Sequence, residues 1–133
     1  MAYFPDLSNE YQIAFGDDVR AIGWLDKNHS FTTNSANPDF LQILKRHIAE
    51  RWTFVASAGI HECELCYRFA SACNVVIPTR TFVYIAPEMI SHYIEAHNYK
   101  PPDEFIQAVI GCPQQKSPEY IELVQKYMYH WEE

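Results

Sequence analysis

The sequence predicts a small α+β fold, a single domain over residues 1–133 with about four helices and a few short strands. Helix start signals, each followed by apolar residues at helical spacing, recur from residue 37 onward. Runs rich in β-branched and aromatic residues, which favour strands, lie between them. The length is that of one compact domain with its own core, and no repeat, low-complexity segment or linker divides the chain.

The first helix has the clearest start. Asn37 is a preferred N-cap residue, Pro38 suits the first helical position, and Asp39 places an acid in the first turn. The expected helix runs to about Arg51. Its apolar face follows helical spacing, at Phe40, Leu41, Leu44, His47 and Ile48.

Three further helices follow in the second half of the chain. Pro87 is expected to open the first of them, which ends at Asn98, a residue that tolerates the left-handed conformation. The next covers 103–110, between Pro101-Pro102 and Gly111. The last starts at Ser117 and extends to about Trp131.

Strands are expected at 52–58, 74–78 and 79–86, with Pro78 marking the break between the last two. Residues 19–26 alternate weakly, and 29–33 are expected to pair with them across a turn at Asp26-Lys27-Asn28. The three tryptophans, Trp24, Trp52 and Trp131, are expected to pack in or at the rim of the core.

Charge and composition narrow the class of partner. The net charge is −7 and the pI near 5.3, and the ten Lys and Arg residues form no patch beyond Lys45-Arg46. Because phosphate neutralisation supplies much of nucleic-acid affinity, a nucleic-acid partner is disfavoured. No stretch approaches a membrane span of roughly 18 apolar residues. The first residues lack signal-peptide features, so we expect a cytoplasmic location.

Cysteine and histidine spacing points to a metal. Cys63 and Cys66 have the C-x2-C spacing of a zinc knuckle, in which a tight turn aims both thiolates at one ion. Downstream, His92 and His97 lie on the expected second helix at a spacing that completes a Cys2His2 site. The predicted α+β fold therefore includes a zinc-knuckle or ββα-like lobe that holds one structural Zn²⁺.

The ligand set has one open alternative. On a regular helix, residues five apart point about 140° away from each other, so we expect a tightened, 3₁₀-type last turn to bring His97 beside His92. If residues 60–63 are extended, His61 shares a face with Cys63. His61 then either replaces one helix histidine as ligand or lies just behind the ligands.

Other readings of these residues fit less well. A thioredoxin-like dithiol needs a βαβ setting, a cysteine hydrolase needs an Asn or Asp that orients the base, and a zincin needs a second histidine after His61-Glu62. Cys73 and Cys112 stand alone and are expected to be plain thiols. Three histidines without partners at ligand spacing are expected to be surface or capping residues: His29, His47 and His130.

Several stretches together resemble a family of small uncharacterised bacterial proteins that carry an H-x-C-E-x-C knuckle and a downstream H-Y-x-x-x-H helix, similar to a zinc finger. They are YFPDLS, AIGWLD, GIHECELC and residues 83–109. The matching positions are His61, Cys63, Glu64, Cys66, His92, His97, Tyr99, Pro101 and Pro102. Asn98 stands where a glycine is common, a position its left-handed tolerance accommodates. The resemblance implies a metal site and no particular activity.

Two functions are consistent with these residues. The first is a structural zinc protein that works by binding a protein partner, because four protein ligands leave no position for water. The second is a hydrolase-like metalloenzyme with three ligands, for example His61, Cys63 and Cys66, and an open water position. Glu62 or Glu64 would then act as the base. The sequence leaves oligomeric state open.

Overall fold

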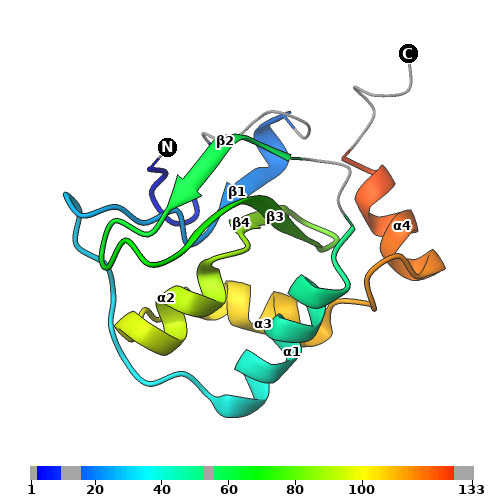
Figure 1. Cartoon of the computed structure of the whole chain (residues 1–133). Helices are drawn as coiled ribbons and strands as arrows, with labels where there is room; N and C mark the ends of the chain where they lie inside the picture. Colours follow the sequence, from blue (N-terminus) through cyan, green and yellow to red (C-terminus); the bar gives the residue numbers. More distant parts are fainter. Residues whose placement is uncertain (1–2, 10–15, 53–55, 128–133) are drawn as a thin grey trace.

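A computed structural model gives the fold (Figure 1) and describes residues 3–9, 16–52 and 56–127, with the backbone alone for residues 16 and 56–61. After a short 3₁₀ turn at Gly16–Asp18, the elements follow in chain order: β1 (Val19–Ala21), α1 (Pro38–Ala49), β2 (Ala56–Glu62), β3 (Ala70–Pro78), β4 (Val83–Pro87), α2 (Ile90–His97), α3 (Asp103–Gly111) and α4 (Pro118–Gln125). The predicted α+β class with four α-helices is confirmed over these residues.

The four strands form one mixed sheet in the order β1-β4-β3-β2. β1 runs parallel to β4, whereas β3 is antiparallel to both β4 and β2. The pairing of β2 with β3 shifts register between Ala56 and His61. β2 and β3 therefore form a hairpin whose loop, residues 63–69, emerges at one end of the sheet.

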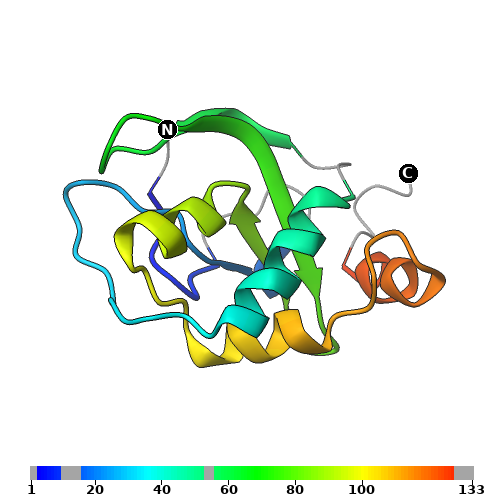
Figure 2. The same ribbon diagram turned by 60° about the horizontal axis from the view of Figure 1, so that its bottom comes forward.

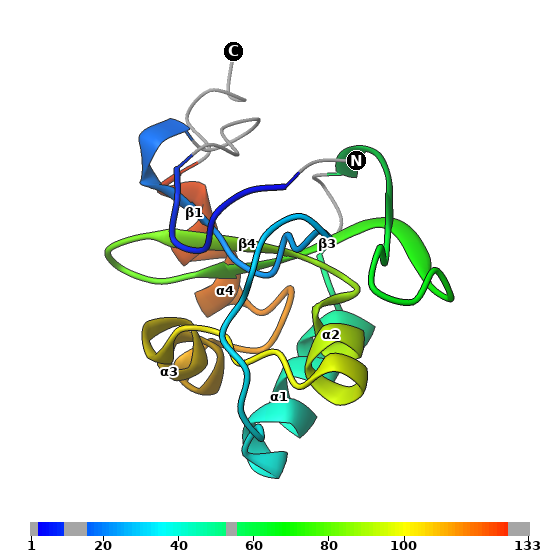
Figure 3. The same cartoon turned by 90° about the vertical axis from the view of Figure 1, so that its left-hand side faces the viewer.

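The core lies on both faces of this sheet, because side chains alternate along each strand. Val75 and Ile77 face a cluster that includes apolar residues of α1, α2 and α3. Val76 faces the opposite cluster, with Trp24 and residues of α4. Figures 1 and 3 show α1, α2 and α3 gathered on one side of the sheet. Figure 2 shows α4 standing apart from these three helices.

Helix starts follow the predicted capping. The Asn37 side chain accepts a hydrogen bond from the Asp39 N–H at 2.7 Å, and Ser117 caps α4 by accepting from the Tyr120 N–H at 3.2 Å. Pro87, however, is the last residue of β4, so α2 begins at Ile90 instead. The predicted end of the fourth helix and Trp131 lie outside the described residues.

Two strand predictions need correction. Residues 29–33 do not pair with 19–26, because β1 pairs with β4 and Thr33 bridges to Tyr99. The strand placed at 52–58 is shifted: β2 covers Ala56–Glu62, while residues 53–55 lie outside the described part. The other edge of β1 is bonded to the N-terminal segment instead: the Leu7 N–H donates to the Ala21 carbonyl at 2.8 Å, and the Ala21 N–H donates to the Ser8 carbonyl at 2.9 Å.

The α2 helix is fixed at both ends by the N-terminal third of the chain. At its start, Ile90 packs against Gly23, whose φ is +77° and where an added Cβ would come within 2.9 Å of the isoleucine Cδ1. Just past its end, the Tyr99 hydroxyl donates to Asp6 at 2.7 Å, and the same carboxylate accepts the Gly23 N–H at 2.9 Å. Burial raises the pKa of Asp6. These contacts set the position of the helix that carries His92 and His97.

Candidate metal centre

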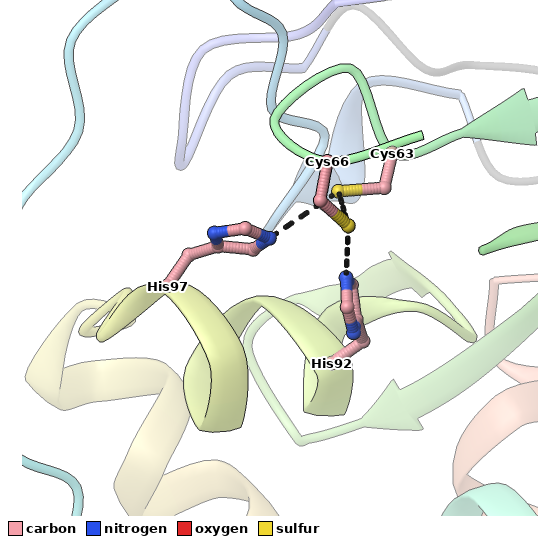
Figure 4. Close-up of side chains that lie close together, drawn as sticks. All are labelled: Cys63, Cys66, His92 and His97. Atoms are coloured by element: carbon pink, nitrogen blue, oxygen red, sulfur yellow. Dashed lines mark hydrogen bonds between the residues drawn. The ribbon is translucent and has the colours of Figure 1, made fainter. Parts of the chain in front are cut away.

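The structure brings Cys63, Cys66, His92 and His97 together. One ligand atom from each of the four residues lies within 4.8 Å of the others. Figure 4 shows the two cysteines on the loop between β2 and β3, with both histidine rings of α2 pointing toward them. The four residues predicted from spacing thus converge on one point, from two segments separated by β3 and β4.

The hairpin loop explains how the two thiols come to share a side. Cys63 follows the last residue of β2, and its N–H donates to the Phe69 carbonyl at 2.9 Å. The Tyr67 N–H donates back to the Cys63 carbonyl at 2.7 Å, and Tyr67 itself is left-handed, with φ of +57°. This tight turn folds the chain over Cys63 and leaves Cys66 Sγ 3.6 Å from Cys63 Sγ.

The last turn of α2 places the second histidine, and its geometry corrects a prediction. The Asn98 N–H donates to the Tyr93 carbonyl, five residues earlier, and Asn98 is left-handed at φ +56° and ψ +26°. A bond to the fifth residue back is the pattern of a widened, π-type turn. The expected tightening of 3₁₀ type is therefore wrong. A 3₁₀ turn rotates each residue further round the axis, whereas a wider turn reduces the angle between His92 and His97.

Three of the six distances between the ligand atoms are close to the edges of a tetrahedral Cys2His2 site. Cys66 Sγ lies 3.3 Å from His92 Nε2, and Cys63 Sγ lies 3.5 Å from His97 Nε2. Around a zinc ion with Zn–S of about 2.3 Å and Zn–N of about 2.0–2.1 Å, tetrahedral S–S and S–N edges are about 3.8 Å and about 3.5 Å. The observed edges agree with these values. The two imidazole rings stand nearly perpendicular, at 84°, with centroids 5.1 Å apart.

The surroundings of His92 favour the neutral imidazole, which is the form that binds a metal. Burial, together with the neighbouring His97, lowers the pKa of His92, so its imidazole is neutral and free to donate a lone pair. At Cys63 the effects oppose each other. Burial raises the pKa of this thiol, while the backbone N–H groups of Leu65 and Cys66 stabilise its thiolate. A divalent cation at this point would supply positive charge that stabilises the Cys63 thiolate.

The candidate base Glu64 is engaged elsewhere. Its carboxylate accepts the Lys27 N–H at 3.2 Å, and the Lys27 ammonium lies 3.4 Å from the Tyr67 hydroxyl. These contacts fasten the loop after β1 to the knuckle. Glu62 is exposed at the end of β2. Glu64 therefore serves as a structural link between two loops.

His61 lies in β2, opposite Ser71 of β3, and its side chain is outside the described part of the structure. Its predicted role as an alternative ligand therefore stays a prediction. Of the other histidines, His29 is exposed and pairs with Asp26 at 2.7 Å. The surface alternative predicted for His47 is wrong, because this residue is 7% exposed on the buried face of α1. His130 lies outside the described residues.

Sequence reasoning missed a buried polar cluster around Gln115. Its Oε1 accepts the Trp52 N–H at 2.9 Å, while its Nε2 lies 3.3 Å from both His47 Nδ1 and the Val76 carbonyl. The Tyr120 hydroxyl donates to the same Val76 carbonyl at 2.7 Å. The only signal in the sequence was a histidine at an apolar helical position.

A cavity of about 810 Å³ lies away from the metal centre, between α3, α4 and the turn after β3. Leu123 and Cys112 contribute to its wall, and Gly111 borders it. Burial raises the pKa of the Cys112 thiol to about 12, as expected for a plain buried thiol. This cavity shares no residue with the Cys/His cluster.

Fold and site together define a small α+β domain with a candidate Cys2His2 metal centre. In the described residues, no helix is long and apolar enough to cross a membrane. Residues 2–110 match the family described as a domain of unknown function, DUF7919, and the chain belongs to that family. No curated protein and no solved structure matches the chain. The matched region includes all four residues of the candidate metal centre, and the description of the family names no activity.

Proposed function

We propose that this protein binds one Zn²⁺ ion through Cys63, Cys66, His92 and His97 and uses it as a structural crosslink. The observation that carries the proposal is the set of ligand distances, which match the edges of a tetrahedral zinc site. Two thiolates with two imidazoles are a donor set typical of zinc, whereas magnesium and calcium prefer oxygen ligands.

The crosslink joins two parts of the fold that are separated in sequence by β3 and β4. The knuckle belongs to the β2–β3 hairpin, and the histidines belong to α2 on the helical side of the sheet. Formation of such a site and folding are linked, because the unfolded chain does not hold the four ligands in place. Zinc binding is therefore expected to stabilise the hairpin and α2 together.

Four protein ligands support a structural role over the three-ligand metalloenzyme considered as its alternative. A catalytic zinc keeps a coordination position for water, and that alternative also needs a carboxylate base beside the metal. Here four donors converge, and Glu64, one of the two candidate bases, is bonded to Lys27. An enzymatic role would require one of the four residues to leave the metal.

We further propose that the protein acts by binding another protein through the knuckle. Tyr67 and Phe69 flank Arg68 on this loop, and both aromatic side chains are 55% exposed. The Phe69 ring packs against the His92 ring, with centroids 4.4 Å apart and the planes tilted by 33°. The zinc site therefore supports a pair of exposed aromatic residues, the residue type that is enriched at protein interfaces.

The zinc proposal is tested on purified protein by elemental analysis and thermal unfolding. We expect one zinc per chain, and a strong chelator is expected to lower the melting temperature as the crosslink is removed. The Cys73→Ser and Cys112→Ser variants are matched controls that remove a thiol outside the cluster and should keep the metal. Metal-free protein whose melting temperature does not respond to added zinc contradicts the proposal.

The partner proposal is tested by comparing two surface changes. Proteins retained by the zinc-loaded chain are identified and purified, and binding is then measured with a Tyr67→Ser/Phe69→Ser variant and with Ile110→Ser. Ile110 is the control because it is also a large exposed apolar residue, at 48%, but lies on α3. We expect only the knuckle variant to weaken binding, by at least about tenfold, the scale of an interface hot spot. Equal binding by both variants rules out the knuckle as the interface.

A further inference from the structure

The two thiols of the metal centre differ in access to solvent. Cys63 is fully buried, whereas Cys66 is partly exposed. Their sulfur atoms are 3.6 Å apart. A small oxidant reaching the centre from solvent therefore meets Cys66 first, with a second sulfur directly behind it.

The loop also lets the two sulfurs meet. A disulfide requires an S–S distance of about 2.05 Å, so the sulfurs must approach by about 1.5 Å. Both residues lie in the single turn between β2 and β3, within four positions of each other. Bond formation thus needs side-chain rotation and a small change in the loop, with no movement of the sheet.

We propose that Cys63 and Cys66 are a redox-sensitive pair that a hydrogen-peroxide-class oxidant converts to a disulfide, with loss of the metal. This inference rests on the proposed zinc function. The Cys66 sulfur attacks one peroxide oxygen, so that an S–O bond forms, the O–O bond breaks and hydroxide leaves. The Cys63 thiolate then attacks the Cys66 sulfur, the S–S bond forms, and the oxygen leaves as a second hydroxide. The two sulfurs together lose two electrons and the peroxide gains them.

Oxidation would uncouple the knuckle from α2. A disulfide leaves only the two histidine nitrogens as donors, which removes half of the coordination sphere. The Phe69 ring packs against the His92 ring, so the exposed aromatic pair loses its support when that imidazole is no longer held. The redox state of the knuckle then controls the surface that we propose binds a partner.

The experiment uses a Cys73→Ser/Cys112→Ser variant loaded with zinc, in which Cys63 and Cys66 are the only thiols left. Zinc content is measured first. Hydrogen peroxide is then added, zinc release is followed with a chromogenic chelator, and intact mass is recorded. We expect one zinc released per chain, a mass loss of about 2 Da, and full reversal by dithiothreitol with added zinc.

A Cys66→His change in the same background is the matched variant, since it keeps four donors and removes the sulfur that oxidant meets first. We expect its zinc release to be at least about tenfold slower. If Cys66→His does not hold zinc, the test rests on the intact mass of the oxidised Cys73→Ser/Cys112→Ser variant. Zinc release with oxygen addition and no disulfide, or zinc that stays bound, overturns the inference. A protein that forms the disulfide but never contained zinc overturns the zinc proposal instead and leaves the redox pair standing.

Discussion

The Asn98 N–H donates to the Tyr93 carbonyl, and this single bond widens the turn that ends α2. The Tyr99 N–H donates to the same carbonyl at 3.1 Å. Asn98 can close the turn because its backbone is left-handed, a conformation that asparagine and glycine adopt more easily than other residues. His97 immediately precedes it, so the direction of the second histidine depends on this cap.

The cap predicts contrasting effects of two substitutions. Asn98→Gly is expected to leave stability and zinc content close to those of the parent, because glycine adopts the left-handed conformation without strain. Asn98→Val is expected to lower the free energy of unfolding by about 1–2 kcal/mol and to weaken zinc binding, since it strains the turn that positions His97. Urea unfolding and chelator competition measure both effects. Equal behaviour of the two variants contradicts this role.

A second prediction concerns Gln115, which is 4% exposed and whose side chain forms hydrogen bonds with Trp52, His47 and Val76. Gln115→Leu removes the hydrogen bonds that the Gln115 side chain forms with the Trp52 N–H and the His47 Nδ1. We expect this loss to lower the free energy of unfolding by about 2–3 kcal/mol. The neighbouring exposed residue provides the control, as Gln114→Leu should change stability by less than about 0.5 kcal/mol. Denaturant unfolding with zinc present measures both.

The sequence predicted which four residues come together in the candidate metal centre because each half of that centre is local. Cys63 and Cys66 share a turn, and His92 and His97 share a helix, so spacing alone identifies them. The Asn37 and Ser117 caps were predictable for the same reason, because each caps a helix that begins at the next residue. Long-range features were not accessible in this way. The parallel pairing of β1 with β4 joins Val19 to Val83, and no local pattern specifies such a register.

The turn at the end of α2 was misjudged for a related reason. Its direction depends on Tyr99, which is held by Asp6 from the other end of the chain. The burial of His47 likewise depends on Gln115, 68 residues away in sequence. In both cases a local rule was overridden by a buried polar contact that only the folded chain brings together.

A third prediction concerns pH. Burial lowers the pKa of His47 in the folded protein, so the folded state resists protonation while the unfolded chain takes up a proton near pH 6.5. Stability from this residue is therefore complete above about pH 6.5 and is lost as pH falls below it. His47→Gln removes the titrating group and is expected to flatten the decrease in unfolding free energy between about pH 7 and about pH 5.

The control for this pH effect is His29→Gln, because His29 is half exposed and lies outside the core. Zinc binding depends on pH in general, so each variant is compared with the parent at equal zinc concentration, which cancels that shared contribution. If the free energy of unfolding of His47→Gln falls with pH as steeply as that of the parent, the prediction is contradicted.

The last prediction decides the ligand set. Cys63→Ser and His97→Ala each leave the ion one donor short, so both are expected to lose zinc and to be severely destabilised, because the knuckle is no longer joined to α2. His61→Ala is expected to keep its zinc and to lose at most about 1 kcal/mol, the value of one hydrogen bond to a ligand. Zinc stoichiometry on the three purified variants separates the two ligand sets. If His61→Ala empties the site while His97→Ala retains the metal, then His61 takes the place of His97 and the metal crosslinks the knuckle to α2 through His92 alone.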